Sequence, residues 1–233
     1  MEADASGAGV RGREPGPAVG LVLAAGEGRR LGLGAKALLT RGGVSLVAQA
    51  VRALRAGGCE AVLVVVGAQA GEVAAEVVAA GGEVVLNPDW ASGLASSFRR
   101  GVAALPGDAA RVVVSLVDQP GVGAEVVQRV LAGHRPGRIA AAEYARVGAA
   151  PADEGSSSGT APSALSAPTP PRARHPMVFD AQRAREAAAL AEGDRGAREF
   201  LRRHPDLLDL VDCAAIGSAA DVDTPEDLHL LEP

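Results

Sequence analysis

The sequence predicts an α/β protein in which a mostly parallel central sheet lies between two layers of helices. Continuous apolar, β-branched runs of strand length recur along the chain, as at Ala61–Val66 and Val112–Val117. Amphipathic stretches with helical spacing lie between them, as at Ser45–Ala56. Strands that are buried on both faces are typical of parallel sheets, and their alternation with helices indicates repeated βαβ units.

Each expected element is justified by its local pattern. Apolar runs define strands, and apolar residues at spacings of three and four define helices, which end at glycines or prolines. The expected strands are Ala18–Ala25, Ala61–Val66, Glu83–Leu86, Val112–Val117, Ile139–Tyr144 and Leu207–Val211. The expected helices are Ser45–Ala56, Glu72–Ala80, one opening at Gly93, Ala124–Ala132, Ala181–Ala191, Gly196–His204 and one whose first residue is Pro225, capped by Thr224.

Two segments lack the composition of a packed core. Residues 1–17 are Gly, Ala, Pro and charged residues without a period, and we expect a disordered tail. Residues 147–173 or so are rich in Pro, Ser, Ala, Gly and Thr, and we expect a flexible low-complexity insertion. The remainder of 18–233 is then a single domain, which fits the chain length of 233 residues.

Composition excludes some function classes. The net charge of −5 and the pI of about 5.4 argue against nucleic-acid polymers and anionic membranes as partners. No apolar run is long enough to span a bilayer. Cys59 and Cys213 lie far apart without metal-ligand spacing, which fits a reducing cytoplasm. We expect a cytoplasmic protein; the sequence says nothing about protein partners.

A glycine-rich loop follows the first strand and organises the chain. Its glycines let the backbone turn sharply and bring N–H groups close to a ligand, and its cations suit a di- or triphosphate. Lys36 is the single lysine of the sequence, which indicates a site that needs a compact ammonium group. The residues concerned are Gly26, Gly28, Arg29, Arg30, Gly32, Gly34 and Lys36.

Three interpretations of this loop are open. It is a plain strand–helix connection, a variant of the dinucleotide-binding fingerprint, or a nucleoside-triphosphate loop. The fingerprint needs an acidic residue at the end of the second strand, where this chain has Val66–Gln69. Lys36 is followed by Ala37 where a Walker loop has Ser or Thr. The nucleotidyltransferase interpretation is favoured because it uses both the arginines and the lysine.

Polar residues follow two other strands. Asn87 lies just past the third strand, where its side chain can contact a base or ribose, and Trp90 follows it as either a ligand contact or a lid on the core. Ser96 and Ser97 lie in the first turn of the next helix, where an anion or hydroxyl can bind.

Two carboxylates are candidate metal ligands. Asp118 follows the strand Val112–Val117, and Asp223 is expected at another strand end. The same edge of a parallel sheet would bring both together as Mg²⁺ ligands that face the phosphates. Helix capping is an alternative explanation for Asp118, but it does not explain both Asp221 and Asp223 at one end.

Taken together, these motifs resemble the nucleotidyltransferase family that contains the molybdenum cofactor cytidylyltransferases. The resemblance covers Ala18 to Leu230 except for the insertion. It rests on Leu23–Lys36, Asn87/Trp90/Gly93/Ser97, Leu116-x-Asp118-Gln119-Pro120, His175-Pro176, Gly193–Arg198 and Asp221-x-Asp223-Thr224-Pro225-x-Asp227-Leu228. It implies a three-layer Rossmann-like nucleotidyltransferase fold and a Mg²⁺-dependent reaction between CTP and the terminal phosphate of a molybdopterin acceptor.

The resemblance also implies residue roles. The Ala-Ala-Gly form at Ala24 and Ala25 is similar to the cytidylyl branch, since the guanylyl branch has glycine at the second alanine. The implied catalytic residues are Arg30, Lys36 and Asp118, and the implied metal ligands are Asp118 and Asp223. The implied nucleotide contacts are Leu23, Ala24, Ala25, Gly26, Gly28, Arg30, Lys36, Asn87, Gly93 and Ser97. His175 and Pro176 face the acceptor, preceded by Arg174 where the family usually has glycine.

Other functions stay open at this point. Within nucleotidyl transfer, the acceptor could be a sugar phosphate or an isoprenoid precursor. An NAD(P)-binding oxidoreductase is disfavoured by the missing ribose-binding acid and by the surplus carboxylates. A non-catalytic partner protein is disfavoured by the presence of Lys36, Asp118 and Asp223.

Overall fold

A seven-stranded sheet forms the centre of the computed structural model, which describes residues 16–144 and 174–232. The strands lie in the order β5-β4-β1-β6-β8-β7-β9. Their bounds are β1 Ala18–Leu23, β4 Ala61–Val66, β5 Glu83–Leu86, β6 Arg111–Leu116, β7 Ile139–Glu143, β8 Arg174–Asp180 and β9 Leu208–Asp212. Only β8 runs antiparallel to its neighbours β6 and β7, so the sheet is mostly parallel, as predicted.

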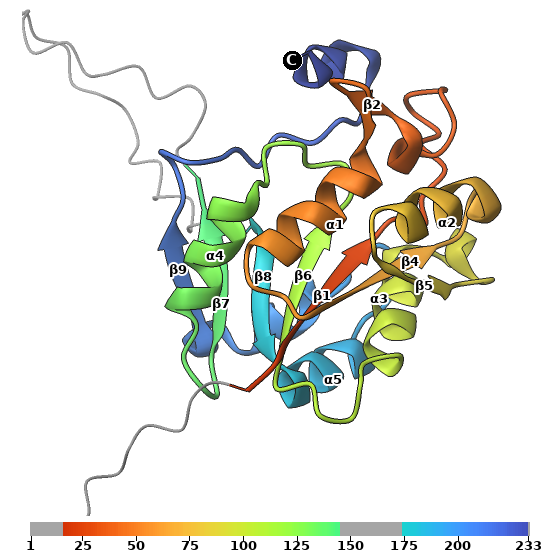
Figure 1. Ribbon diagram of the computed structural model, residues 1–233. Helices are drawn as coiled ribbons and strands as arrows, with labels where there is room; N and C mark the ends of the chain where they lie inside the picture. Colours follow the sequence, from red (N-terminus) through yellow and green to blue (C-terminus); the bar gives the residue numbers. More distant parts are fainter. Residues whose placement is uncertain (1–15, 145–173, 233) are drawn as a thin grey trace, which may run out of the picture.

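Helices cover both faces of this sheet, which confirms the α/β fold (Figure 1). The side chains of β1 alternate between two cores: Leu21 packs with Phe98 of α3 on one face, and Val22 packs with Val47 of α1 on the other. The helices are α1 Leu46–Ala56, α2 Ala70–Ala79, α3 Leu94–Ala103, α4 Ala124–Gly133, α5 Ala181–Ala189 and α6 Arg198–Arg203. None of the helices in the described ranges is long and apolar enough to cross a membrane.

Shorter elements complete the described chain. The strands β2 (Thr40–Arg41) and β3 (Val44–Ser45) form a small hairpin before α1, and Ser45 caps α1 by accepting a hydrogen bond from Ala48 N. Short 3-10 helices lie at Lys36–Leu38, Trp90–Ser92, Pro205–Leu207 and Pro225–Leu231. The last of these stands where a helix starting at Pro225 was predicted.

Close packing sets helix α3 against β1. A Cβ atom on Gly101 would lie 2.4 Å from the Leu21 side chain, so only glycine lets the helix approach the strand this closely. This approach brings the start of α3 next to the loop that follows β1, where ligands bind in open α/β sheets.

The structure corrects several predicted boundaries. Backbone contacts with the strand β6 begin at Gly16 and Pro17, which were predicted to belong to the tail. The strand β8 was not predicted, because Pro176 interrupts its apolar pattern. The low-complexity insertion at 147–173 and the tail up to residue 15 lie outside the described residues.

Candidate active site

The glycine loop closes one side of a cavity of about 540 Å³ at the carboxyl ends of β1 and β6. Gly28 has a φ of +67°, and a Cβ atom on it would lie 2.6 Å from Gly34 O, so the two arms of the loop touch there. A Cβ atom on Gly26 would meet no atom within 4 Å, although Gly26 lines the cavity. The backbone at Gly26 therefore leaves space that a ligand can fill.

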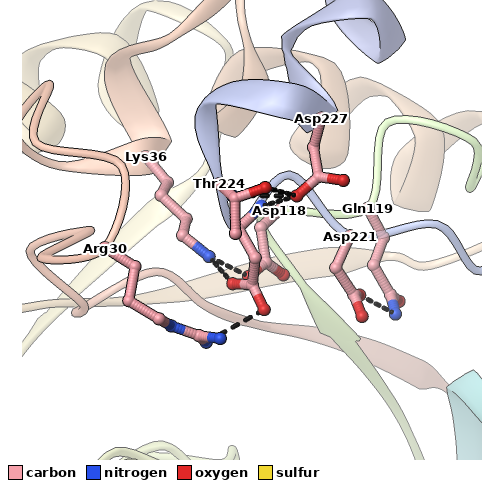
Figure 2. Close-up of polar contacts among 8 residues, drawn as sticks. Arg30, Lys36, Asp118, Gln119, Asp221, Thr224 and Asp227 are labelled. Atoms are coloured by element: carbon pink, nitrogen blue, oxygen red, sulfur yellow. Dashed lines mark hydrogen bonds and ion pairs between the residues drawn. The ribbon is translucent and has the colours of Figure 1, made fainter.

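Lys36 lines this cavity. Its ammonium group lies between two carboxylates (Figure 2). Its Nζ donates to Asp118 Oδ2 at 2.9 Å and also pairs with Asp223 Oδ1. Arg30 Nη2 donates to Asp223 Oδ2 at 2.9 Å. The structure thus brings together Arg30, Lys36, Asp118 and Asp223, which come from the loop, from the end of β6 and from the C-terminal segment.

Electrostatic interactions within this cluster favour the charged forms of Lys36 and Asp223. Burial opposes the charged form of Lys36, but the fields and hydrogen bonds of Asp118 and Asp223 together raise its pKa. Burial likewise disfavours the Asp223 anion, but Lys36 and Arg30 outweigh it and lower the pKa of that carboxyl. Both shifts favour an ammonium group on Lys36 beside a carboxylate anion on Asp223.

Asp223 reaches the cluster in a different way from the one predicted. It does not end a strand: β9 ends at Asp212, and Asp223 lies in the coil beyond it. The backbone N–H of Val222 donates to Asp118 O at 2.9 Å, which lays this coil across the end of β6. Asp227 then fixes it, because its Oδ2 accepts the N–H groups of Asp223 and Thr224 at 3.0 and 2.8 Å.

Asp221 is a third carboxylate at this edge, which the predicted site omitted. Gln119 Nε2 donates to Asp221 Oδ1 at 2.7 Å (Figure 2). Burial, reinforced by the fields of Asp118 and Asp223, raises the pKa of Asp221. Its place in the Asp221-x-Asp223 motif was the signal that could have identified it.

Carboxylate oxygens of this kind are the ligands that Mg²⁺ and Mn²⁺ take in proteins. Asp118 and Asp223 already converge on one cation, the Lys36 ammonium, so their geometry fits a shared metal ion as well. Within the described ranges, no group of three His, Cys, Asp or Glu residues is arranged to hold a metal by itself. A divalent ion held by Asp118 and Asp223 would complete its coordination with water or with ligand oxygens.

Two of the predicted nucleotide contacts do not reach the cavity. Ala24 is buried in the core, and its N–H donates to Val65 O in β4. Asn87 is also buried; its Nδ2 donates to Ser96 Oγ and Ser97 Oγ at 2.9 and 3.0 Å, and its Oδ1 accepts Asp89 N–H. Asn87 therefore orders the turn behind the cavity, because all of its polar atoms are engaged within the protein.

The other predicted residues of this group line the cavity, as do Trp90 and Asp194. The lining residues that were predicted are Leu23, Ala25, Gly26, Gly28, Arg30, Lys36, Gly93, Ser97, Asp118 and Asp223.

The start of helix α3 is occupied by the chain itself. The Leu94 N–H donates to Asp194 Oδ1 at 3.3 Å, and the Ala95 N–H donates to Gly193 O at 2.9 Å. Gly93 has a φ of +110°, and a Cβ atom on it would lie 2.7 Å from Asp194 Oδ1. A carboxylate of the protein, that of Asp194, therefore lies at the helix start where we expected an anion or a hydroxyl to bind.

A second cavity of about 720 Å³ adjoins the first and shares Leu23, Leu94, Leu116, Asp194 and Asp221 with it. Apolar side chains line its interior, and arginines surround it. The apolar residues include Phe98, Val114, Met177, Phe179 and Leu201, and the arginines are Arg174, Arg195, Arg198 and Arg202. Sequence reasoning placed only His175 and Pro176 at an acceptor site; His175 lines this cavity, whereas Pro176 is buried beside it.

His175 is neutral at physiological pH. Burial, with a smaller contribution from the positive charge of Arg174, lowers its pKa to about 4. Its backbone carbonyl accepts a hydrogen bond from Tyr144 Oη at 3.0 Å, which fixes the start of β8 against the end of β7. The positive charge of the second cavity therefore comes from the arginines.

Comparisons with known proteins agree with this architecture. The nicotine blue oxidoreductase of Paenarthrobacter nicotinovorans is 42% identical over 217 residues, which cover 91% of this chain and 95% of that protein. The crystal structure of an Rv0371c homologue from Mycobacterium sp. strain JC1 matches with a TM-score of 0.70 at 28% identity, covering 92% of this chain and 94% of that one. The M. tuberculosis Rv0371C protein, solved as a complex with manganese, matches with a TM-score of 0.66 at 25% identity, covering 92% and 97%.

The model of the MobA-like NTP transferase domain matches residues 20–207, which include the glycine loop, Asp118 and the whole second cavity except Leu208 and Asp221. The chain therefore belongs to the family of MobA-like NTP transferase domains and is an enzyme of the nucleotidyltransferase type.

Proposed function

We propose that this enzyme transfers CMP from CTP to the terminal phosphate of a molybdopterin acceptor and releases pyrophosphate. The observation that carries the proposal is the cluster of Lys36, Asp118 and Asp223 on the floor of a glycine-lined cavity that opens into a second, arginine-rimmed cavity. Two adjoining cavities suit two substrates that must meet at one phosphorus atom.

The reaction needs positioning and charge neutralisation more than a covalent intermediate. An oxygen of the acceptor phosphate forms a bond to the α-phosphorus of CTP, and the bond from that phosphorus to the β-phosphate oxygen breaks. Lys36 and Arg30 would neutralise the departing pyrophosphate, since both cations line the first cavity and lie close enough together to share Asp223 as a partner. Asp118 and Asp223 would hold a Mg²⁺ ion, whose chemistry is to polarise the phosphoryl oxygens.

The acceptor would lie in the second cavity. Its apolar interior can take a planar ring system, and its arginines can hold an anionic group. His175 would contribute a neutral surface there, because its pKa is about 4. A cytoplasmic location would supply both substrates, and it fits Cys59 and Cys213 as buried free thiols.

The test is the release of pyrophosphate from each of the four ribonucleoside triphosphates, with and without the molybdopterin cofactor. We expect release that depends on CTP, on the acceptor and on a divalent ion. A sugar phosphate or an isoprenoid phosphate tested in parallel identifies a different acceptor. Release that is absent with all acceptors contradicts the proposal.

A second candidate activity rests on the relative that is named a nicotine blue oxidoreductase and is 42% identical. In that case, the first cavity would hold a reduced nicotinamide dinucleotide and the second cavity a planar oxidised dye. The oxidation of NADH and NADPH, followed at 340 nm with nicotine blue as the oxidant, tests it. Dye-dependent oxidation without any pyrophosphate release would replace the first proposal by the second.

A further inference from the structure

Gln69 has a backbone conformation that its residue type disfavours. It follows β4 and precedes α2, with φ 48° and ψ 40°, and it is the one non-glycine residue of the described ranges with a positive φ. This left-handed region brings the Cβ atom close to a carbonyl oxygen, and glycine or asparagine adopts it more readily. Gln69 does not cap α2 with its side chain either. Neither backbone preference nor helix capping explains glutamine at this position.

The Gln69 side chain reaches the glycine loop instead. Its Oε1 accepts a hydrogen bond from Ala35 N at 2.7 Å. Its Nε2 donates to Glu72 Oε2 at 3.1 Å, which determines the end of the amide that faces the loop. The other backbone donors recorded in the described loop 26–35 are Leu31 and Gly32, and both bond to Gly28 O within the loop. The bond to Gln69 is thus the backbone hydrogen bond that ties the loop to another element.

Close packing extends this contact to Lys36. Gly34 has a φ of +83°, and a Cβ atom on it would lie 2.6 Å from Gln69 Oε1. A Cβ atom on Gly28 would lie 2.6 Å from Gly34 O and 3.1 Å from Lys36 Cγ. Gln69, Gly34, Gly28 and Lys36 therefore form a series of close contacts, through which a displacement of Gln69 can reach Lys36.

We propose that Gln69 is a positioning residue that holds the glycine loop closed, so that Lys36 Nζ stays between Asp118 and Asp223. Unfavourable backbone conformations persist at functional sites when the surrounding structure requires them, and here the requirement is the hydrogen bond to Ala35. The inference rests on the proposed function in one respect only, namely that Lys36 faces the phosphates of a nucleotide.

The test uses Gln69→Asn. Asparagine suits the left-handed conformation, but its amide is one methylene shorter and cannot reach Ala35 N. We expect an unchanged or higher Tm, faster hydrogen exchange at the amide of Ala35, and a fall of at least tenfold in kcat/KM for CTP. Activity would then fall without any loss of stability, which a merely structural role does not produce.

Two further variants sharpen the result. The double change Gln69→Glu with Glu72→Gln exchanges donor and acceptor in that pair and keeps an oxygen for Ala35 N–H, so it should restore slow exchange and most of the activity. Gln182→Asn is the matched control, because Gln182 lies on α5 and its side chain bonds, within the described part of the chain, only to Glu186. It should leave the exchange at Ala35 and the activity unchanged.

Hydrogen exchange and the affinity for inorganic tripolyphosphate require no turnover, so they test Gln69 even if the enzyme proves not to transfer CMP. Slow exchange at Ala35 and unchanged tripolyphosphate affinity in Gln69→Asn would overturn the inference. A parallel loss of Tm and activity that the double variant does not rescue would also overturn it.

Discussion

At the scale of single residues, the site depends on one cation shared by two anions. Lys36 is largely buried, with 13% of its side chain exposed, whereas 72% of the Arg30 side chain is exposed. The two cations therefore differ in what they can do. Lys36 is held between its two carboxylate partners, whereas the exposed Arg30 would have room to follow the departing pyrophosphate of the proposed reaction.

Replacing Asp118 or Asp223 by Asn should lower turnover at least 100-fold. Each change removes an anionic ligand for a metal ion but keeps the shape of the side chain. The Tm should change little in either variant, since Lys36 keeps one carboxylate partner. The double variant should show no further proportional loss, because both residues act through one ion. Steady-state rates measured against Mg²⁺ concentration test this, with Asp108→Asn on the exposed surface as the control.

Ala25 lines the nucleotide cavity, and its methyl group is expected to exclude a purine base. Ala25→Gly should therefore raise the ratio of GTP to CTP turnover about tenfold, since one methyl group in a pocket is worth roughly 1–3 kcal/mol. Ala24→Gly is the matched control: Ala24 lies in the core, so that change should lower stability and leave the ratio unchanged. If both variants prefer CTP as strongly as the wild type, base selection lies elsewhere.

At the scale of elements, the sequence predicted the parallel part of the sheet, because each strand and helix there has an apolar pattern that can be recognised within its own residues. β1, β4 and β6 are short β-branched runs, and those patterns are local. In the strand β8, the apolar run after Pro176 is only Met177–Phe179, which is too short to predict a strand from the local pattern. Its pairing with β6 and β7 is decided by tertiary contacts.

The glycine loop can be tested as an element through Gly26. A methyl group there would project into empty space within the cavity, so Gly26→Ala should leave the fold intact and weaken nucleotide binding at least tenfold. Gly71→Ala is the control, because Gly71 is an uncrowded residue of α2, where alanine should stabilise the helix by about 0.5–1 kcal/mol. Calorimetric titration of both variants with CTP would contradict the assignment if their affinities were equal.

The edge strand β9 is fixed to the sheet by Asp209, which pairs with Arg135 and Arg138. Mainly through the hydrogen bonds from Arg138, these arginines lower the pKa of Asp209 to about 2. A lowered carboxyl pKa adds stability that is present above the unfolded value near 4 and is lost as the pH falls toward 2. Asp209→Asn should therefore lower the Tm at pH 6 and flatten its decline between pH 5 and pH 2. A parallel decline in both proteins would contradict this.

At the scale of the whole molecule, the active site is assembled by contacts between distant parts of the chain. Asp118 was predictable, because it follows a strand whose pattern is clear. The convergence of Asp223 and Asp118 was predicted for the wrong reason, since Asp223 does not end a strand. The backbone hydrogen bond between Val222 and Asp118 and the contacts of Asp227 hold it there. The second cavity was largely missed, because β8, the loop at Asp194 and α6 meet only in the folded protein.

The same long-range organisation makes the low-complexity insertion testable. The strands on either side of it are hydrogen-bonded partners, since Ala142 of β7 lies opposite Arg174 of β8. A short linker can therefore join the two strand ends, and shortening a loop changes stability by only about 0.6 kcal/mol for each factor of two in its length.

Replacing residues 151–170 by a short Gly-Ser linker should leave the Tm within about 3 °C of the wild type, as measured by calorimetry. CTP affinity should also persist, because the glycine loop and the cluster around Lys36, which line the first cavity, lie outside the replaced segment. A larger fall in Tm would mean that the replaced residues pack against the domain, and a loss of acceptor turnover with an intact fold would assign them to the second cavity.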